Sequence, residues 1–265
     1  MTERTTELGP LRVGEVVPDA SFLSVLENRG LSPTWDLGTG KAPELAEATT
    51  ILALTWPGGV VMAGDRRATA GNVIAHSRVR KVYPADEHSA VAISGTAGMA
   101  LELITLFQTE LEHYEKIEGA TLSLEGKANF LARMIRNNLA LAFQGLVVIP
   151  LFCGYDLDEG SGRLFSFDVV GGRYDELHYA TTGSGGQEAR SFLKSAWAPD
   201  LDRDQAVSTA IEALVAASEE DAATGGPDVR RGIYPTVVTV SDEGVTELDD
   251  EMIASVVESV LEGRP

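Results

Sequence analysis

Residues 49–67, TTILALTWPGGVVMAGDRR, contain the pattern that decides the fold. After Thr49 the chain is β-branched or apolar as far as residue 56, and Pro57-Gly58-Gly59 is typical of a turn. A second apolar run, residues 60–63, follows the turn. We therefore expect an antiparallel β-hairpin that begins directly after Thr49.

The 48 residues before this hairpin have a different composition. They contain Pro10, Pro18, Pro33 and Pro43, several glycines and few long apolar runs. Such a segment is typical of a poorly ordered leader rather than a domain, although an ordinary flexible tail has the same composition. We expect two parts: a leader over residues 1–48 and a folded domain over residues 49–265.

Beyond the hairpin, strands and helices come in blocks. Short strands are expected at residues 81–83, 89–93, 151–155, 163–168, 177–180 and 236–240. Helices are expected around 187–197 and 204–218, and three others show apolar faces. These faces are Leu103, Ile104, Phe107, Leu111 and Tyr114; Leu131, Met134, Ile135, Leu139 and Ala142; and Ile253, Val256, Val257, Val260 and Leu261. For the helix that carries the second of these faces, Ser123 is the expected N-cap and Gly145 the expected stop near its C-terminal end.

This block order argues against a doubly wound parallel sheet, in which strands and helices alternate strictly. It favours an α+β fold in which two packed antiparallel β-sheets are flanked by helix pairs. We therefore predict a four-layer αββα sandwich.

Charge and composition exclude several classes of function. The chain has 265 residues and a formal net charge of −19, which disfavours nucleic acid and anionic membranes as partners. No window of eighteen apolar residues and no signal-peptide pattern is present, so we expect a cytoplasmic protein without a membrane span. The single cysteine, Cys153, lies in an apolar run and is expected to be a buried, inert thiol.

Searches for common catalytic motifs find little. The four histidines have no metal-ligand spacing, and the G-x-S-x-G and Walker A patterns are missing, so no metal and no cofactor is expected. The run Gly183-Ser184-Gly185-Gly186, between a predicted strand and helix, lacks the full dinucleotide fingerprint.

The border between leader and hairpin offers a different chemistry. A threonine hydroxyl needs a base, and cleavage between Ala48 and Thr49 would free an α-amine on the same residue. Such an amine has a pKa of about 7.7–8.0, which suits a general base near neutral pH. Thr49 would then be nucleophile and base at once. A Thr-Thr pair alone equally fits simple β-propensity.

The companions of Thr49 carry a family resemblance. TTILALTWPGGVVMAGDRRAT is followed by RKVY, SGTAG, GSGG and DAATGGPD, at residues 49–69, 80–83, 94–98, 183–186 and 221–228. In this order the sequence resembles the proteasome β-subunits over about residues 49–248. It is most similar to the actinobacterial type.

The resemblance implies a fold and a set of roles. The fold is that of the N-terminal-nucleophile hydrolases, in which Thr49 attacks, Lys81 is a neighbouring cation and Asp65 orients Lys81. The backbone N–H of Gly95 would stabilise the oxyanion. The supporting polar residues would be Ser184, Asp221 and Thr224, the last standing where many relatives have serine.

The same resemblance implies a substrate pocket and partners. The pocket residues would be Ala68, Thr69, Val79, Tyr83, Ile93 and Ala97, none of them charged, which predicts chymotrypsin-like cleavage after apolar residues. The partners would be other β-subunits and α-subunits, as two stacked seven-membered β-rings capped by α-rings, together with a ring-shaped AAA ATPase and unfolded protein substrates. Residues 1–48 would be a propeptide removed autocatalytically.

Two alternatives differ in chemistry. One is a catalytically silent ring subunit, and the other is an HslV-like peptidase or another N-terminal-nucleophile amidohydrolase. Joint retention of Thr49, Asp65, Lys81 and Gly95 speaks against the silent subunit. The extent of the resemblance speaks against an N-terminal-nucleophile amidohydrolase that acts on a small amide.

Overall fold

The computed structural model describes residues 49–71 and 73–262, which carry two five-stranded antiparallel β-sheets. The predicted hairpin, β1 (Thr50–Trp56) and β2 (Gly59–Gly64), lies in the middle of the first sheet. Its strand order is β10-β1-β2-β11-β12. The other three strands are β10 (Tyr179–Gly183), β11 (Thr236–Ser241) and β12 (Gly244–Glu247).

The second sheet has the strand order β5-β6-β7-β8-β9 and is a simple antiparallel meander. Its strands are β5 (Val82–Asp86), β6 (Ser89–Gly95), β7 (Val148–Asp156), β8 (Ser161–Phe167) and β9 (Arg173–Glu176). A small separate hairpin, β3 (Ala68–Ala70) and β4 (Val73–His76), follows β2.

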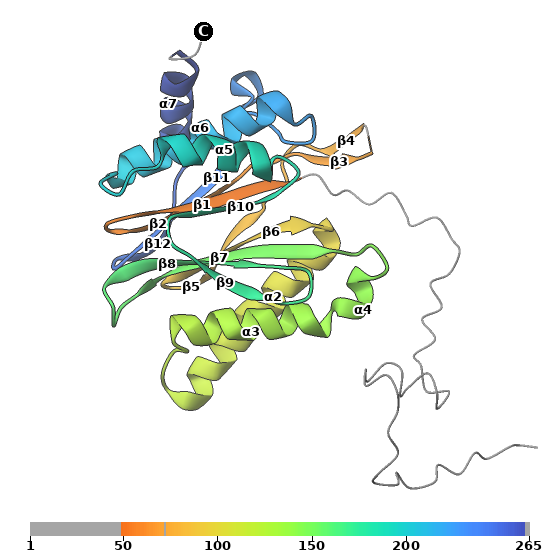
Figure 1. Ribbon diagram of the computed structural model, residues 1–265, viewed down its shortest axis with the longest axis vertical. Helices are drawn as coiled ribbons and strands as arrows, with labels where there is room; N and C mark the ends of the chain where they lie inside the picture. Colours follow the sequence, from red (N-terminus) through yellow and green to blue (C-terminus); the bar gives the residue numbers. More distant parts are fainter. Residues whose placement is uncertain (1–48, 72, 263–265) are drawn as a thin grey trace, which may run out of the picture. The chain divides into compact units, whose positions relative to one another are not determined.

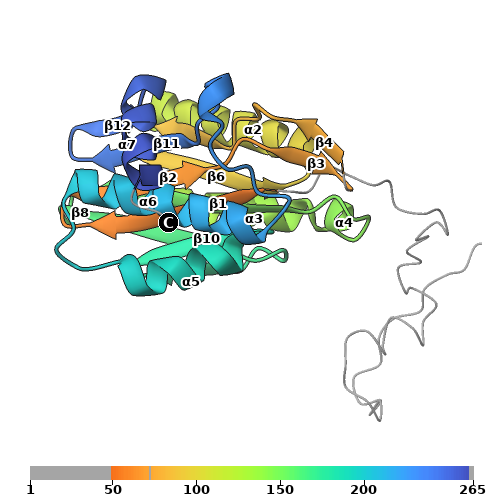
Figure 2. The same cartoon turned by 90° about the horizontal axis from the view of Figure 1, so that it is seen from above.

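Helices cover the outer face of each sheet (Figures 1 and 2). Beside the second sheet lie α2 (Ala97–Glu118), α3 (Leu124–Asn137) and the short α4 (Leu139–Ala142). Beside the first lie α5 (Gly186–Ala196), α6 (Arg203–Glu220) and α7 (Asp250–Glu262), and a 3₁₀ turn, Val229–Arg231, precedes β11. The predicted α+β class and αββα layers are therefore confirmed, with the short α4 and α7 as a third helix on either side.

Three apolar clusters fill the spaces between the layers, and the hairpin contributes to two of them. Leu52 and Leu54 of β1 pack under α5 and α6, whereas Ile51 and Ala53 face the second sheet. This alternation follows from the period of two along a strand. Cys153 lies fully buried between the sheets, as expected. Burying both faces of β1 fixes its register, and with it the position of the residue just before it.

The structure corrects some predicted elements. The helix expected to continue through Leu139 and Ala142 is interrupted at Asn138, whose side-chain amide donates to the Met134 carbonyl and competes with the helical bonds. The strand expected at 177–180 begins only at Tyr179. Strands β3, β4, β9 and β12 were not predicted.

Two residues of the predicted apolar faces are exposed. Tyr114 of α2 is 39% exposed and Leu261 of α7 is 41% exposed, so the buried faces of both helices are narrower than predicted. Ser123 does cap α3, because its side chain accepts a hydrogen bond from the Gly126 N–H at 3.1 Å. Among the described residues, no helix has the length and apolarity that a bilayer crossing requires.

Candidate active site

Thr49 lies immediately before β1 and is only 5% exposed. Its carbonyl accepts a hydrogen bond of 2.9 Å from the backbone N–H of Ser184. The neighbouring position of β10 must be glycine: Gly183 has φ +101°, and a Cβ there would lie 1.7 Å from the Thr49 carbonyl oxygen. The backbone of Thr49 is thus held against the Gly183-Ser184-Gly185-Gly186 run, which explains Gly183 without a phosphate ligand.

Asp65 and Lys81 form a buried ion pair at the ends of two strands. Asp65 follows β2 and Lys81 precedes β5, and their side chains are 0% and 3% exposed. Lys81 Nζ donates to Asp65 Oδ1 at 2.5 Å and to the Arg67 carbonyl at 2.6 Å. The sequence separation of sixteen residues gives no hint of this contact, which depends on the two sheets being stacked.

The carboxylate of Asp65 accepts from the backbone as well. Its Oδ1 also accepts from the Thr50 N–H at 2.8 Å, and its Oδ2 accepts from the N–H groups of Arg67 and Gly225, both at 2.9 Å. A buried carboxylate with this many donors is fully compensated. Asp65 therefore links the first residue of β1, Lys81 and the loop after α6.

Burial lowers the pKa of Lys81, and the ion pair with Asp65 opposes that effect without cancelling it. A lysine in this setting gives up a proton more readily than an exposed one. The side chain also lies at the cavity that Thr49 lines. A cation there would favour the neutral form of a nearby amine and stabilise developing negative charge.

A second polar cluster includes Ser184, whose backbone N–H bonds the Thr49 carbonyl. Ser184 Oγ and Thr224 Oγ1 both donate to Asp221 Oδ2 at 2.6 Å. Burial raises the pKa of Asp221, but hydrogen bonds from Ser184, Thr224 and the backbone outweigh it and hold that pKa below its ordinary value. Asp221 is accordingly a carboxylate at neutral pH, and Thr224 keeps the hydroxyl that a serine would supply.

A cavity of about 340 Å³ opens beside Thr49 and Lys81. Gly95 lines it at the end of β6, with φ +111°, and a Cβ there would lie 2.1 Å from the Val147 carbonyl oxygen. Four of the predicted pocket residues also line this cavity: Ala68, Val79, Tyr83 and Ile93. The predicted nucleophile, cation, oxyanion donor and pocket thus meet at one hollow.

Some predicted residues lie elsewhere or outside the described part. Thr69 is not among the cavity's lining residues, because successive side chains of a strand point to opposite faces and Ala68 occupies the inner one. Ala97 begins α2, and its side chain lies outside the described residues. Ala48 and the predicted propeptide 1–48 also lie outside them.

The cavity also has lining residues that the sequence reasoning missed: His76, Arg80, Ala100, Leu101 and Ile104. The last three belong to the first turns of α2, and the short spacing from Gly95 is a signal that could have found them. Arg80 adds a charge to a pocket expected to be apolar. Its guanidinium is paired with Glu247 at 2.6 Å and lies over the Tyr83 ring at 5.0 Å.

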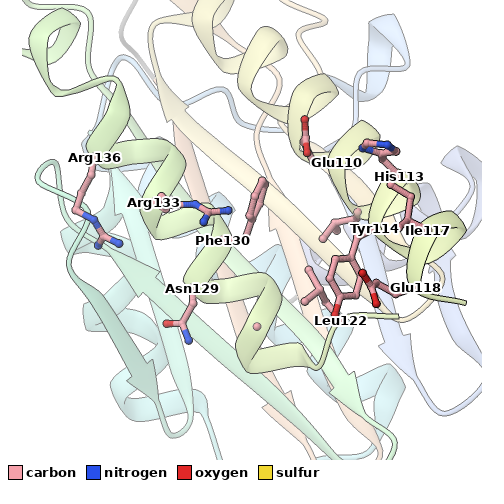
Figure 3. A pocket seen from close by; sticks show the side chains of 12 residues that line it. Glu110, His113, Tyr114, Ile117, Glu118, Leu122, Asn129, Phe130, Arg133 and Arg136 are labelled. Carbon is pink, nitrogen blue, oxygen red and sulfur yellow. The ribbon is translucent and has the colours of Figure 1, made fainter. Parts of the chain in front are cut away.

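A second hollow, of about 460 Å³, lies between α2 and α3 (Figure 3). Its side chains come from both helices and include His113, Tyr114, Phe130 and Arg133. None of the predicted site residues lines it. Within residues 49–71 and 73–262, no group of three or more His, Cys, Asp or Glu side chains is arranged to hold a metal ion.

Comparison with known proteins gives consistent matches. Residues 45–229 match the family model described as "Proteasome subunit". A "Proteasome subunit beta" from Streptomyces griseus is 50% identical over 271 residues, covering 100% of this chain and 96% of the relative. Proteins of the same name from Acidothermus cellulolyticus and Acidimicrobium ferrooxidans are 56% and 55% identical, covering 85% and 80% of this chain and 79% and 78% of their own.

Proposed function

This chain belongs to the proteasome subunit family, with relatives named as β-subunits, and we propose that it is a catalytic β-subunit, a threonine endopeptidase whose nucleophile is Thr49. The observation that carries the proposal is the meeting of Thr49, Lys81 and Gly95 at one cavity, with Asp65 bonded to Lys81 at 2.5 Å. A subunit with a purely structural role has no need of this arrangement.

The proposed activation is a self-cleavage. The Thr49 hydroxyl attacks the Ala48 carbonyl, the Ala48–Thr49 C–N bond breaks, and an ester forms between Ala48 and the Thr49 oxygen. Water then opens the ester, which leaves the Ala48 carboxylate on the propeptide and a free amine and hydroxyl on Thr49. The base that turnover requires therefore exists only after residues 1–48 have been removed.

In turnover the Thr49 amine takes the proton of its own hydroxyl while the oxygen attacks the peptide carbonyl. The Gly95 N–H and the Lys81 cation stabilise the negative charge that develops. The amine then protonates the leaving nitrogen, and water hydrolyses the resulting acyl-enzyme ester. Ser184, Asp221 and Thr224 fix the backbone and polar surroundings of Thr49 through the bonds described above.

The cavity supports a preference for apolar residues before the scissile bond. Ala68, Val79 and Ile93 supply apolar surface, and the charge of Arg80 is engaged by Glu247. Apolar pockets discriminate weakly between similar groups, so cleavage is broad. The particle we propose has two seven-membered β-rings between α-rings in the cytoplasm, where a ring ATPase delivers unfolded proteins for degradation.

A peptidase assay tests this proposal. Particles assembled with an α-type partner are given fluorogenic peptides that end in a large apolar, a basic or an acidic residue. We expect hydrolysis, fastest for the apolar peptide, and its loss in Thr49→Ala. An assembled wild-type particle without activity identifies a silent subunit, and an active Thr49→Ala particle excludes Thr49 as nucleophile. A particle that hydrolyses small amides but no peptide favours another amidohydrolase.

A further inference from the structure

Thr50, the first residue of β1, is fully buried and touches both polar clusters of the site. On one side, its N–H donates to Asp65 Oδ1 at 2.8 Å, and its carbonyl accepts from the Asp65 N–H at 3.1 Å. On the other side, its hydroxyl lies 2.6 Å from Thr224 Oγ1 and accepts from the Gly185 N–H at 3.0 Å.

The direction of these hydrogen bonds follows from the number of protons. Asp221 is a carboxylate and can only accept, so Thr224 spends its single hydroxyl proton on Asp221 Oδ2. Thr224 must then accept from Thr50, whose own hydroxyl oxygen accepts from Gly185. The chain therefore runs one way, from the Gly185 N–H through the Thr50 and Thr224 hydroxyls to the Asp221 carboxylate.

Close packing around the two hydroxyls requires glycine at position 185. A Cβ on Gly185 would lie 2.5 Å from Thr224 Oγ1 and 2.8 Å from Thr50 Oγ1. The hydroxyl of Thr50 has its one proton and an acceptor site committed, and so cannot serve Thr49 as an acid or base. Its contribution is to hold one end of a rigid link next to the nucleophile.

We propose that Thr50 is a positioning residue that holds Thr49 in place through its bonds to Asp65 of the Asp65–Lys81 pair and to Thr224 of the Ser184–Asp221–Thr224 cluster. This inference rests on the proposed function, because it assigns Thr50 a part in the reaction of Thr49. The neighbouring peptide unit is shared by the two threonines, so any shift of Thr50 moves the Thr49 amine and hydroxyl relative to Lys81. Misplacement of reacting groups by a fraction of an ångström lowers the rate of the chemical step.

The test replaces the hydroxyl of Thr50 without changing its volume. Thr50→Val keeps the shape but leaves the Gly185 N–H without its acceptor and the Thr224 oxygen without its donor. We expect kcat for an apolar fluorogenic peptide to fall by about tenfold to a hundredfold, with KM nearly unchanged, because such buried bonds are costly to lose. Thr50→Ser, which keeps the hydroxyl, should restore most of kcat.

Two further comparisons separate positioning from general destabilisation. Thr209→Val makes the same change at another buried threonine, in α6. The Thr209 hydroxyl donates to the Gln205 carbonyl, and its loss should leave kcat unchanged. A cycle of Thr50→Val, Thr224→Val and the double variant should be strongly non-additive, because both substitutions break the same contact.

Thr50→Cys keeps the inference testable if Thr50→Val does not assemble. Cysteine is close to serine in size but is a weak hydrogen-bonding group, so its kcat should lie well below that of Thr50→Ser. Equal kcat in these two variants, or wild-type kcat in Thr50→Val, would overturn the inference. Those results leave the proposed function intact. The proposed function fails instead if wild-type particles are inactive or if Thr49→Ala is as active as wild type.

Discussion

Replacing Asp65 with asparagine removes one charge from the buried pair with almost no change of shape. Both carboxylate oxygens of Asp65 accept from two donors each: Oδ1 from Thr50 N and Lys81 Nζ, and Oδ2 from Arg67 N and Gly225 N. Whichever oxygen the amide group replaces, its NH₂ faces two other donors. At least two buried donors therefore lose their acceptor in either orientation of the amide.

The expected losses follow from the environment of the pair. The side chains of Asp65 and Lys81 are 0% and 3% exposed, and breaking such a pair on one side typically costs about 3–5 kcal/mol of stability. Without Asp65, the ion pair no longer opposes the effect of burial, so the pKa of Lys81 falls further and the cation at the site is less favoured. Removal of one electrostatic group at a developing charge costs about 10²–10³ in rate, which is the fall in kcat that we expect.

The assay compares kcat, KM and thermal unfolding of assembled particles with those of a matched control. Asp86→Asn breaks another largely buried Lys–Asp pair, in which Lys127 Nζ lies 2.7 Å from Asp86 Oδ2, at the far end of β5. This control should lower the unfolding temperature and leave kcat within about twofold of wild type, because it is independent of the site. An equal loss of kcat in both variants, or an Asp65→Asn particle with the kcat of wild type, would refute the assigned role.

Three other predictions test the cysteine, a helix cap and the pocket. Burial raises the pKa of Cys153 to about 12, so the thiolate fraction at pH 8 is about 10⁻⁴. Iodoacetamide should therefore label Cys153 only after unfolding, and rapid labelling of the native protein would contradict this. Ser123→Ala should destabilise the chain by about 1 kcal/mol in chemical denaturation, because α3 loses its cap, and an unchanged midpoint would contradict it. Val79→Glu should raise kcat/KM for a peptide that ends in a basic residue, relative to one that ends in an apolar residue, by about tenfold or more. An unaltered ratio of the two kcat/KM values would exclude Val79 from the pocket.

The hairpin and the long helices could be predicted because their signals are local. The alternation along β1 and the Pro57-Gly58-Gly59 turn lie within one short segment, and the apolar faces of α2 and α3 repeat at the helical period. The break at Asn138 could not be predicted in this way, because one side-chain hydrogen bond decides it. The short strands β9 and β12 depend on partners far along the chain.

Only part of the candidate site could be predicted from the sequence. Thr49 was indicated by its own chemistry and by the change in composition before it, whereas Asp65, Lys81 and Gly95 came from the family resemblance. Local patterns could not show that a loop after α6 brings Asp221 and Thr224 to β1, since 174 residues separate Thr50 from Thr224. For the same reason the hydrogen-bond chain through Thr50 was visible only in the structure.

The most direct test of Thr49 as nucleophile is to determine which residue is the N-terminus of the chain in an assembled particle. Intact mass and N-terminal sequencing are carried out on wild type and on Thr49→Ala, each co-expressed with an α-type partner. We expect the wild-type chain to begin at Thr49 and the variant to remain uncut between residues 48 and 49. An assembled wild-type particle that retains residues 1–48, or a Thr49→Ala chain cut at that same bond, would contradict it.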